Sequence, residues 1–153
     1  MDRRKWLLFL LKIILALLFF MAAVSKLKEP AAFAQNIENY KIFGGVLSRW
    51  IAVWVPFLEI LLGLLLISGR WTAEALLLTL LLYLVFDAMI LQAFLRGLDV
   101  TCGCFGNTHQ TPIGGLKILE NTILTLLAVS AFILYRKQVK KGGLSGPPYN
   151  TVL

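Results

Sequence analysis

The sequence predicts an all-α membrane protein, a bundle of four transmembrane helices with a short amphipathic interfacial helix after the first span. Of its 153 residues, 59% are apolar and only 15% are charged, too few charges to cover the surface of a soluble domain of this length. Four apolar segments are each about 20 residues long, which at 1.5 Å per residue crosses a hydrocarbon core of about 30 Å. A soluble core would explain one such segment, but not four in so short a chain.

The predicted spans belong to one membrane domain, residues 1–141, and cover residues 6–25, 50–68, 73–95 and 116–135. The second span carries Pro56, Glu59 and Gly63 at spacings of three and four, which places them near one helix face. Proline and glycine are tolerated in membrane helices, and a small residue lets a neighbouring helix approach closely. The short turn at 69–72 predicts that the second and third spans are antiparallel neighbours. The tail, residues 142–153, is predicted to be disordered because of its glycines and prolines.

Basic residues cluster beside the span ends, at residues 3–5, at Arg70 and at residues 136–141. In a four-span bundle these clusters fall on one side of the membrane, and such an excess marks the cytoplasmic side. We therefore expect a multi-pass protein of a bacterial inner membrane with both termini in the cytoplasm. This placement also explains the net charge of +7 without nucleic acid. Five basic residues of the outward loops oppose the bias: Lys26, Lys28, Lys41, Arg49 and Arg96. A cleaved signal peptide is the alternative for the N-terminus, although the apolar run exceeds the usual signal length.

Residues 30–43 form a shorter helical pattern in the first outward loop. Pro30 suits the first helical position, and two glycines follow residue 43. Phe33, Ile37 and Tyr40 fall on one face, which is typical of an amphipathic helix at the membrane surface. We favour a connector that covers the end of the bundle over a lid or docking surface beside the second outward loop.

Both cysteines, Cys102 and Cys104, lie in the second outward loop, residues 96–115, called the cysteine loop below. Residues two apart have Cα atoms roughly 5.5–7 Å apart, and a disulfide needs about 4.4–6.8 Å, so the chain must bend at Gly103. So small a ring would be strained and easily reduced, and it closes too short a loop to constrain the unfolded chain. In an oxidising compartment the pair therefore predicts a redox-active disulfide and not a structural one.

Other polar residues of the cysteine loop are candidates for tuning the thiols. His109 and Arg96 would favour a thiolate, whereas Asp99 would disfavour it. Glu120, near the outer end of the last span, either meets the cysteine loop or begins the helix. Asp99, His109 and the two cysteines could also supply four metal ligands, but their spacing fits none of the common zinc patterns. We therefore expect no metal.

Glu59 and Asp87 lie near the middle of the second and third spans. A charge at that depth costs at least about 2.5–3.5 kcal/mol, so each side chain must face the bundle interior and find a partner. One arrangement places the two carboxyl groups together as a proton or quinone site. The alternative uses them for interhelical hydrogen bonds with Thr79, Tyr83 or Gln92.

Over about residues 6–135 the chain resembles the MauE branch of the DoxX-like membrane proteins. The resemblance rests on Cys102–Gly106, on Ser25–Pro30 with the downstream Phe33, Asn39 and Tyr40, and on Pro56, Glu59 and Gly63. It implies a four-helix inner-membrane protein of methylamine utilisation, working with a thioredoxin-like periplasmic partner that makes disulfides in the small subunit of methylamine dehydrogenase. The wider group implies quinone-linked oxidation of sulfur compounds. Two positions depart from the family pattern: Thr101 stands where Asp is frequent, and Glu120 stands where Arg often precedes the Asn at 121.

The leading functional hypothesis is a membrane thiol–disulfide oxidoreductase. Cys102 and Cys104 would exchange electrons with a thioredoxin-like extracytoplasmic partner, with quinone as the coupled carrier and no covalent cofactor. One alternative is a non-enzymatic assembly or scaffold subunit of a periplasmic dehydrogenase system. The other is a small transporter or electron conduit using Glu59 and Asp87. Expected partners are the lipid bilayer, the thioredoxin-like protein and a dehydrogenase subunit.

Overall fold

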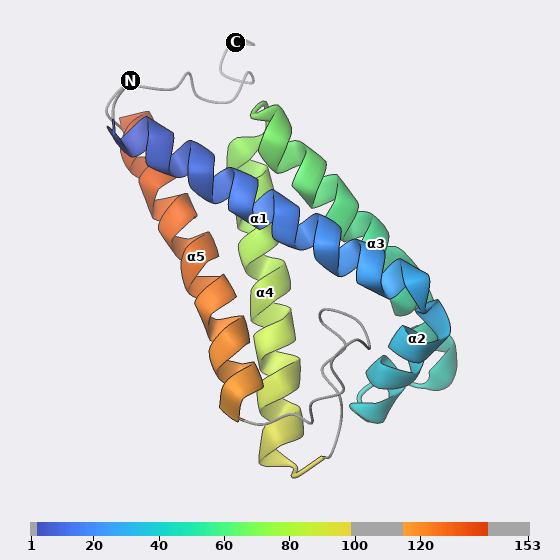
Figure 1. Ribbon diagram of the computed structural model, residues 1–153. Coiled ribbons are helices and arrows are strands. Elements are labelled where there is room, and N and C mark those ends of the chain that lie inside the picture. Colours follow the sequence, from blue (N-terminus) through green and yellow to red (C-terminus); the bar gives the residue numbers. More distant parts are fainter. Residues whose placement is uncertain (1–2, 99–114, 141–153) are drawn as a thin grey trace, which may run out of the picture.

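The computed structural model describes residues 3–98 and 115–140, and in this part of the chain every regular element is a helix (Figure 1). The helices are α1 (Arg3–Lys28), α2 (Pro30–Asn39), α3 (Gly45–Ser68), α4 (Thr72–Leu95) and α5 (Gly115–Lys140). All except α2 are long and apolar enough to cross a membrane. The predicted all-α architecture of four spans and one short helix after the first is therefore confirmed. The short helix ends at Asn39 and not at residue 43.

The long helices form a bundle that α1 crosses obliquely, packing against both α3 and α5 (Figure 1). α4 packs against α5 and also against α3, which confirms that the second and third spans are neighbours. The start of α1, the end of α5 and the turn between α3 and α4 lie at one end of the bundle (Figure 1). α2, the end of α4 and the start of α5 lie at the other end. Most of the cysteine loop (99–114) and the tail lie outside the described residues.

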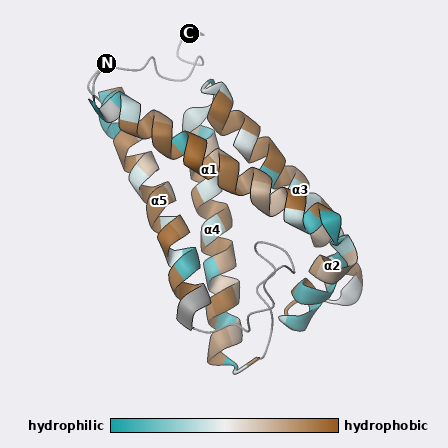
Figure 2. Cartoon of the chain, in the orientation of Figure 1, coloured by the Kyte–Doolittle hydropathy of each residue, from teal (hydrophilic) through white to brown (hydrophobic). Residues whose placement is uncertain are grey.

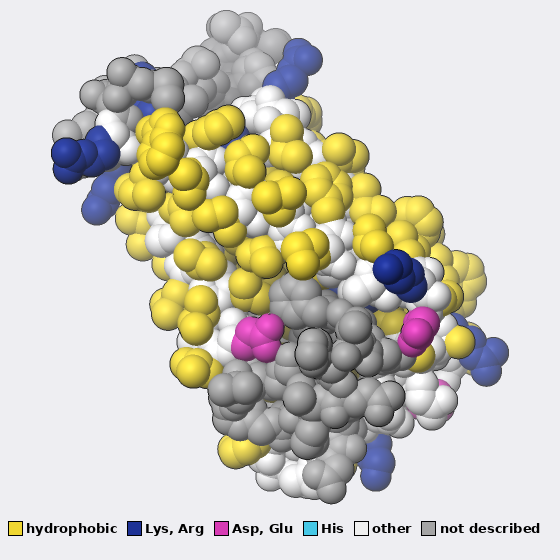
Figure 3. Space-filling view, in the orientation of Figure 1, with side chains coloured by type: hydrophobic (Ala, Val, Ile, Leu, Met, Phe, Trp, Pro, Cys, Tyr) yellow, Lys and Arg dark blue, Asp and Glu magenta, His cyan; other side chains and the backbone are white. Residues whose placement is uncertain are grey.

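The outer surface of the bundle carries many exposed apolar side chains along the long helices. Brown residues dominate the long helices in Figure 2, and yellow side chains predominate on the described part of the face drawn in Figure 3. Large side chains such as Leu17, Leu81 and Leu126 are more than half exposed. An apolar area of this size would be unfavourable in water but matches lipid tails. The chain is a multi-pass membrane protein.

Close contact between α1 and α3 depends on a glycine. A Cβ atom added at Gly63 would lie 3.0 Å from the ring of Phe20 on α1, so no larger residue fits without movement. Pro56 and Glu59 are buried on α3 together with Gly63, as their spacing predicts. Small residues of this kind let membrane helices approach.

The apolar face of α2 packs on the bundle. Phe33 and Ile37 are buried with Ala52 of α3, while Tyr40 packs on Ala93 near the end of α4. Burial raises the pKa of the Tyr40 hydroxyl to about 12. These contacts agree with the interpretation of this helix as a connector that covers one end of the bundle.

Candidate functional site

A group of polar side chains lies inside the membrane-spanning part of the bundle and is called the polar core below. Its members come from four helices: Lys26 from α1, Glu59 from α3, Asp87 from α4, and Asn121 and Thr125 from α5. Ionisable residues within membrane helices are costly and commonly mark functional sites. The polar core is therefore the candidate site in the described part of the chain.

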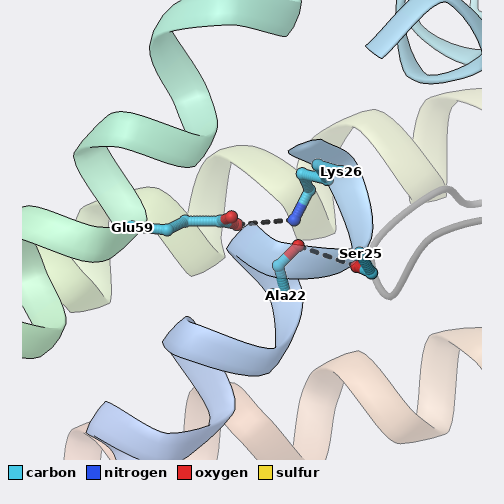
Figure 4. A network of polar contacts seen from close by, with 4 residues as sticks. All are labelled: Ala22, Ser25, Lys26 and Glu59. Atoms are coloured by element: carbon cyan, nitrogen blue, oxygen red, sulfur yellow. Dashed lines mark hydrogen bonds and ion pairs between the residues drawn. The ribbon is translucent and has the colours of Figure 1, made fainter. Parts of the chain in front are cut away.

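The first half of the polar core is an ion pair between α1 and α3. Lys26 Nζ donates a hydrogen bond of 2.6 Å to Glu59 Oε1, and the two side chains are only 1% and 3% exposed (Figure 4). Two charges so fully removed from water must be paired, because either one alone would be strongly unfavourable. The pair thereby fixes α1 against α3.

The expectation that Lys26 lies in an outward loop is wrong. α1 continues to Lys28, where Glu29 and Pro30 interrupt it, and so carries Lys26 into the bundle. Lys26 follows Leu15, Phe19 and Ala22 on the buried face of α1. That spacing of three and four residues was the sequence signal that could have placed it inside.

Two aromatic rings also lie close to the Lys26 ammonium group. Its Nζ lies 5.4 Å from the ring centre of Phe33 on α2 and 5.8 Å from that of Phe86 on α4. Both distances are within the range of cation–π attraction. One ammonium group therefore contacts α2, α3 and α4 from its position on α1, at the end of the bundle that α2 covers.

The second half of the polar core joins α4 to α5. Asp87 accepts hydrogen bonds of 2.6 Å from both the Asn121 amide, at Oδ1, and the Thr125 hydroxyl, at Oδ2. Asn121 and Thr125 are four residues apart and therefore lie on one face of α5. Leu124 and Ala128 are buried on the same face, and this pattern is the signal that could have identified the two partners.

The two carboxyl groups are bonded to different partners and not to each other. Glu59 is bonded to Lys26, whereas Asp87 is bonded to α5. Among the described residues, the hydrogen bonds to these two carboxyl groups come from Lys26, Asn121 and Thr125. The expected partners Thr79, Tyr83 and Gln92 therefore do not fill this role, and Thr79 Oγ1 is itself buried without a hydrogen bond.

A small cavity lies next to both halves of the polar core. Its volume is about 20 Å³, and its polar lining comes from Lys26, Glu59, Tyr83 and Asn121. A single water needs about 10–15 Å³ by this measure, whereas sites for small organic molecules occupy about 300–1,000 Å³. The cavity has room for water but not for a quinone ring.

The remaining candidate residues lie at or beyond the helix ends. Cys102, Cys104, Asp99 and His109 lie outside the described residues. The side chain of Arg96 is exposed just after α4, and that of Glu120 is exposed on α5. Asn121 follows Gly115 by six positions in α5, which corresponds to a rise of about 9 Å along the helix. The polar core is thus about 9 Å along α5 from the point where the cysteine loop joins it.

The chain is similar to proteins described as methylamine utilisation proteins. A family model described as Methylamine utilisation protein MauE matches residues 4–134. The methylamine utilization protein MauE of Paracoccus denitrificans is 35% identical over 124 residues, and that of Paracoccus versutus is 32% identical over 125 residues. These matches cover 80% and 81% of this chain and 67% of each relative. Protein TlpB of Flavobacterium psychrophilum is 27% identical over 144 residues, covering 88% of this chain and 39% of that protein. No solved structure matches the chain.

Proposed function

The chain belongs to the MauE family, and from this premise we propose that it is a membrane thiol–disulfide oxidoreductase serving methylamine utilisation. The observation that carries the proposal is the sequence Cys102-Gly103-Cys104, which lies inside the stretch matched by the family. The cysteine loop joins α4 and α5 at the end of the bundle opposite the basic ends of α1 and α5 (Figure 1). With those basic ends in the cytoplasm of a bacterium, the thiols would face outward.

The proposed reaction is thiol–disulfide exchange with a thioredoxin-like extracytoplasmic protein. A thiolate of the reduced partner attacks one sulfur of the Cys102–Cys104 disulfide, which breaks that bond and forms a mixed disulfide. The second thiolate of the partner then attacks the mixed disulfide and releases the reduced pair on this chain. Two electrons pass from the partner to Cys102 and Cys104, and the partner leaves as a disulfide. As the resemblance to the MauE branch implies, the target of that partner would be a dehydrogenase subunit outside the membrane.

The reduced pair must return its two electrons to an acceptor, for which we propose a membrane quinone. The cavity beside the polar core is too small for a quinone ring, so this cavity does not fit the acceptor. The contact between quinone and thiols would then lie outside the polar core.

The proposal is tested with the purified full-length protein in detergent micelles, using reduced thioredoxin as thiol donor and a short-chain quinone as acceptor. Alkylation of the remaining thioredoxin thiols reports their oxidation. We expect Cys102→Ser and Cys104→Ser each to abolish turnover, while Thr111→Ser, a conservative change in the same loop, leaves it unchanged. Undiminished oxidation in both cysteine variants would show that the reaction does not use this pair.

A non-enzymatic assembly subunit is the second candidate. It is favoured by the internal pairing of the polar core, in which Glu59 and Asp87 are both bonded to neighbouring helices. In this case Cys102 and Cys104 would remain oxidised in cells under all growth conditions. Acid quenching followed by alkylation distinguishes the two candidates, because an oxidoreductase shows a reduced fraction that changes with the supply of reduced partner.

A further inference from the structure

One oxygen of the polar core has no partner among the described residues. Glu59 Oε1 is bonded to Lys26, but Glu59 Oε2 is buried without a hydrogen bond, and the residue as a whole is 2% exposed. Buried carboxylate oxygens are nearly always bonded to a donor, which is often an ordered water molecule. The orphaned oxygen therefore indicates a ligand that can donate a hydrogen bond.

The cavity of about 20 Å³ beside Glu59 has the size and the lining for such a ligand. Asn121 lines it from α5 and uses one amide hydrogen for Asp87, which leaves a second N–H and the carbonyl oxygen of its side chain. Tyr83 contributes a hydroxyl-bearing side chain from α4. Apolar cavities stay dry, whereas polar ones with two to four partners hold water.

We propose that this cavity binds one water molecule, which donates to Glu59 Oε2 and bonds to the Asn121 amide. The water joins the Lys26–Glu59 pair to Asp87 and Thr125, so that the polar core becomes one hydrogen-bonded network across α1, α3, α4 and α5. Glu59 then has a polar connection toward α5 and the attachment of the cysteine loop. This inference depends on the geometry of the polar core and not on the proposed thiol chemistry.

The test is radiolytic footprinting of the full-length protein in micelles. Brief X-ray exposure generates hydroxyl radicals from bound water, and these label adjacent side chains even where bulk water does not reach them. Tyr83 lines the cavity and is 7% exposed, whereas Tyr40 is 4% exposed and packs elsewhere. We expect Tyr83 to be labelled at least about fivefold faster than Tyr40. Equally slow labelling of the two tyrosines would overturn the proposal.

A cavity-filling variant provides the second arm. Ala22 lines the cavity from α1, so Ala22→Val places two further methyl groups there. We expect labelling of Tyr83 to fall to the level of Tyr40, while unchanged labelling of Tyr40 shows that the fold is retained. Persistent fast labelling of Tyr83 in this variant would mean that the radicals come from another source, and the proposal would fail. If the variant does not fold, the comparison of Tyr83 with Tyr40 labelling in the wild-type protein still tests the proposal. Because neither arm uses the cysteines, failure of the thiol assay leaves this result intact.

Discussion

Removing one member of the Lys26–Glu59 pair should strongly destabilise the bundle. The two side chains are 1% and 3% exposed, and one hydrogen bond of 2.6 Å joins them. Lys26→Met leaves the Glu59 carboxylate buried without a countercharge, and Glu59→Leu leaves the Lys26 ammonium group buried without the carboxylate that pairs with it. Loss of one partner from a buried pair costs about 3–5 kcal/mol, and we expect each variant to lose that much unfolding free energy.

The double variant separates pairing from packing. Lys26→Met with Glu59→Leu removes both charges and keeps apolar volume at both positions, so no uncompensated charge remains. Replacing a buried pair by apolar residues is often neutral or stabilising. We therefore expect the double variant to lie within about 1 kcal/mol of wild type or to be more stable, with a coupling energy of several kcal/mol in the double-mutant cycle.

The assay is reversible unfolding in mixed micelles, followed by far-ultraviolet circular dichroism as the fraction of denaturing detergent increases. Lys28→Met is the matched control, because Lys28 belongs to the same helix but is exposed, and we expect a change within about 0.5 kcal/mol. Single variants that lose less than about 1 kcal/mol would refute the reasoning. A double variant that loses the sum of the two single losses would refute it as well.

Three further predictions concern other parts of the bundle. Thr125→Val removes a hydroxyl donor 2.6 Å from Asp87 and should cost about 1–3 kcal/mol in the same unfolding assay. Gly63→Leu should cost at least about 1–3 kcal/mol, because even its Cβ would lie 3.0 Å from the Phe20 ring. Burial raises the pKa of Tyr40 to about 12, against about 10 in the unfolded chain. The neutral Tyr40 hydroxyl therefore makes its full contribution to the unfolding free energy below about pH 10, and this contribution is lost as the pH rises toward 12. Tyr40→Phe should reduce the alkaline loss of stability, measured as the unfolding midpoint between about pH 9 and pH 12.

Each of these predictions has a control in the same helix or the same assay. Thr122 is exposed and donates to its own helix, so Thr122→Val should change the stability by less than about 0.5 kcal/mol. Leu64 faces away from the bundle core next to Gly63, and Leu64→Ala should be similarly mild. If these controls cost as much as the buried changes, the assigned contacts are not responsible. If the Tyr40→Phe variant and the wild type show identical pH profiles, ionisation of Tyr40 does not contribute.

The number and position of the membrane helices could be predicted because they depend on local properties. In lipid, the backbone N–H and C=O groups of an apolar segment of about 20 residues must form their hydrogen bonds within the segment. A helix satisfies them whatever its neighbours are. The buried face of α3 could likewise be predicted from the sequence, because the spacing of Pro56, Glu59 and Gly63 places them on one side of the helix. The same reasoning applies to Phe33 and Ile37 on α2.

The sequence by itself thus determined an all-helical membrane protein, the face of α3 that is buried, and the close spacing of Cys102 and Cys104. Only the tertiary structure decided that Lys26 is the partner of Glu59 and that α5 supplies the donors to Asp87. These partners are 33, 34 and 38 positions apart along the chain. Their contact depends on the crossing of α1 over the bundle and on the rotation of each helix about its axis. Both are set by side-chain packing between helices, because lipid supplies no hydrophobic force that favours one arrangement over another.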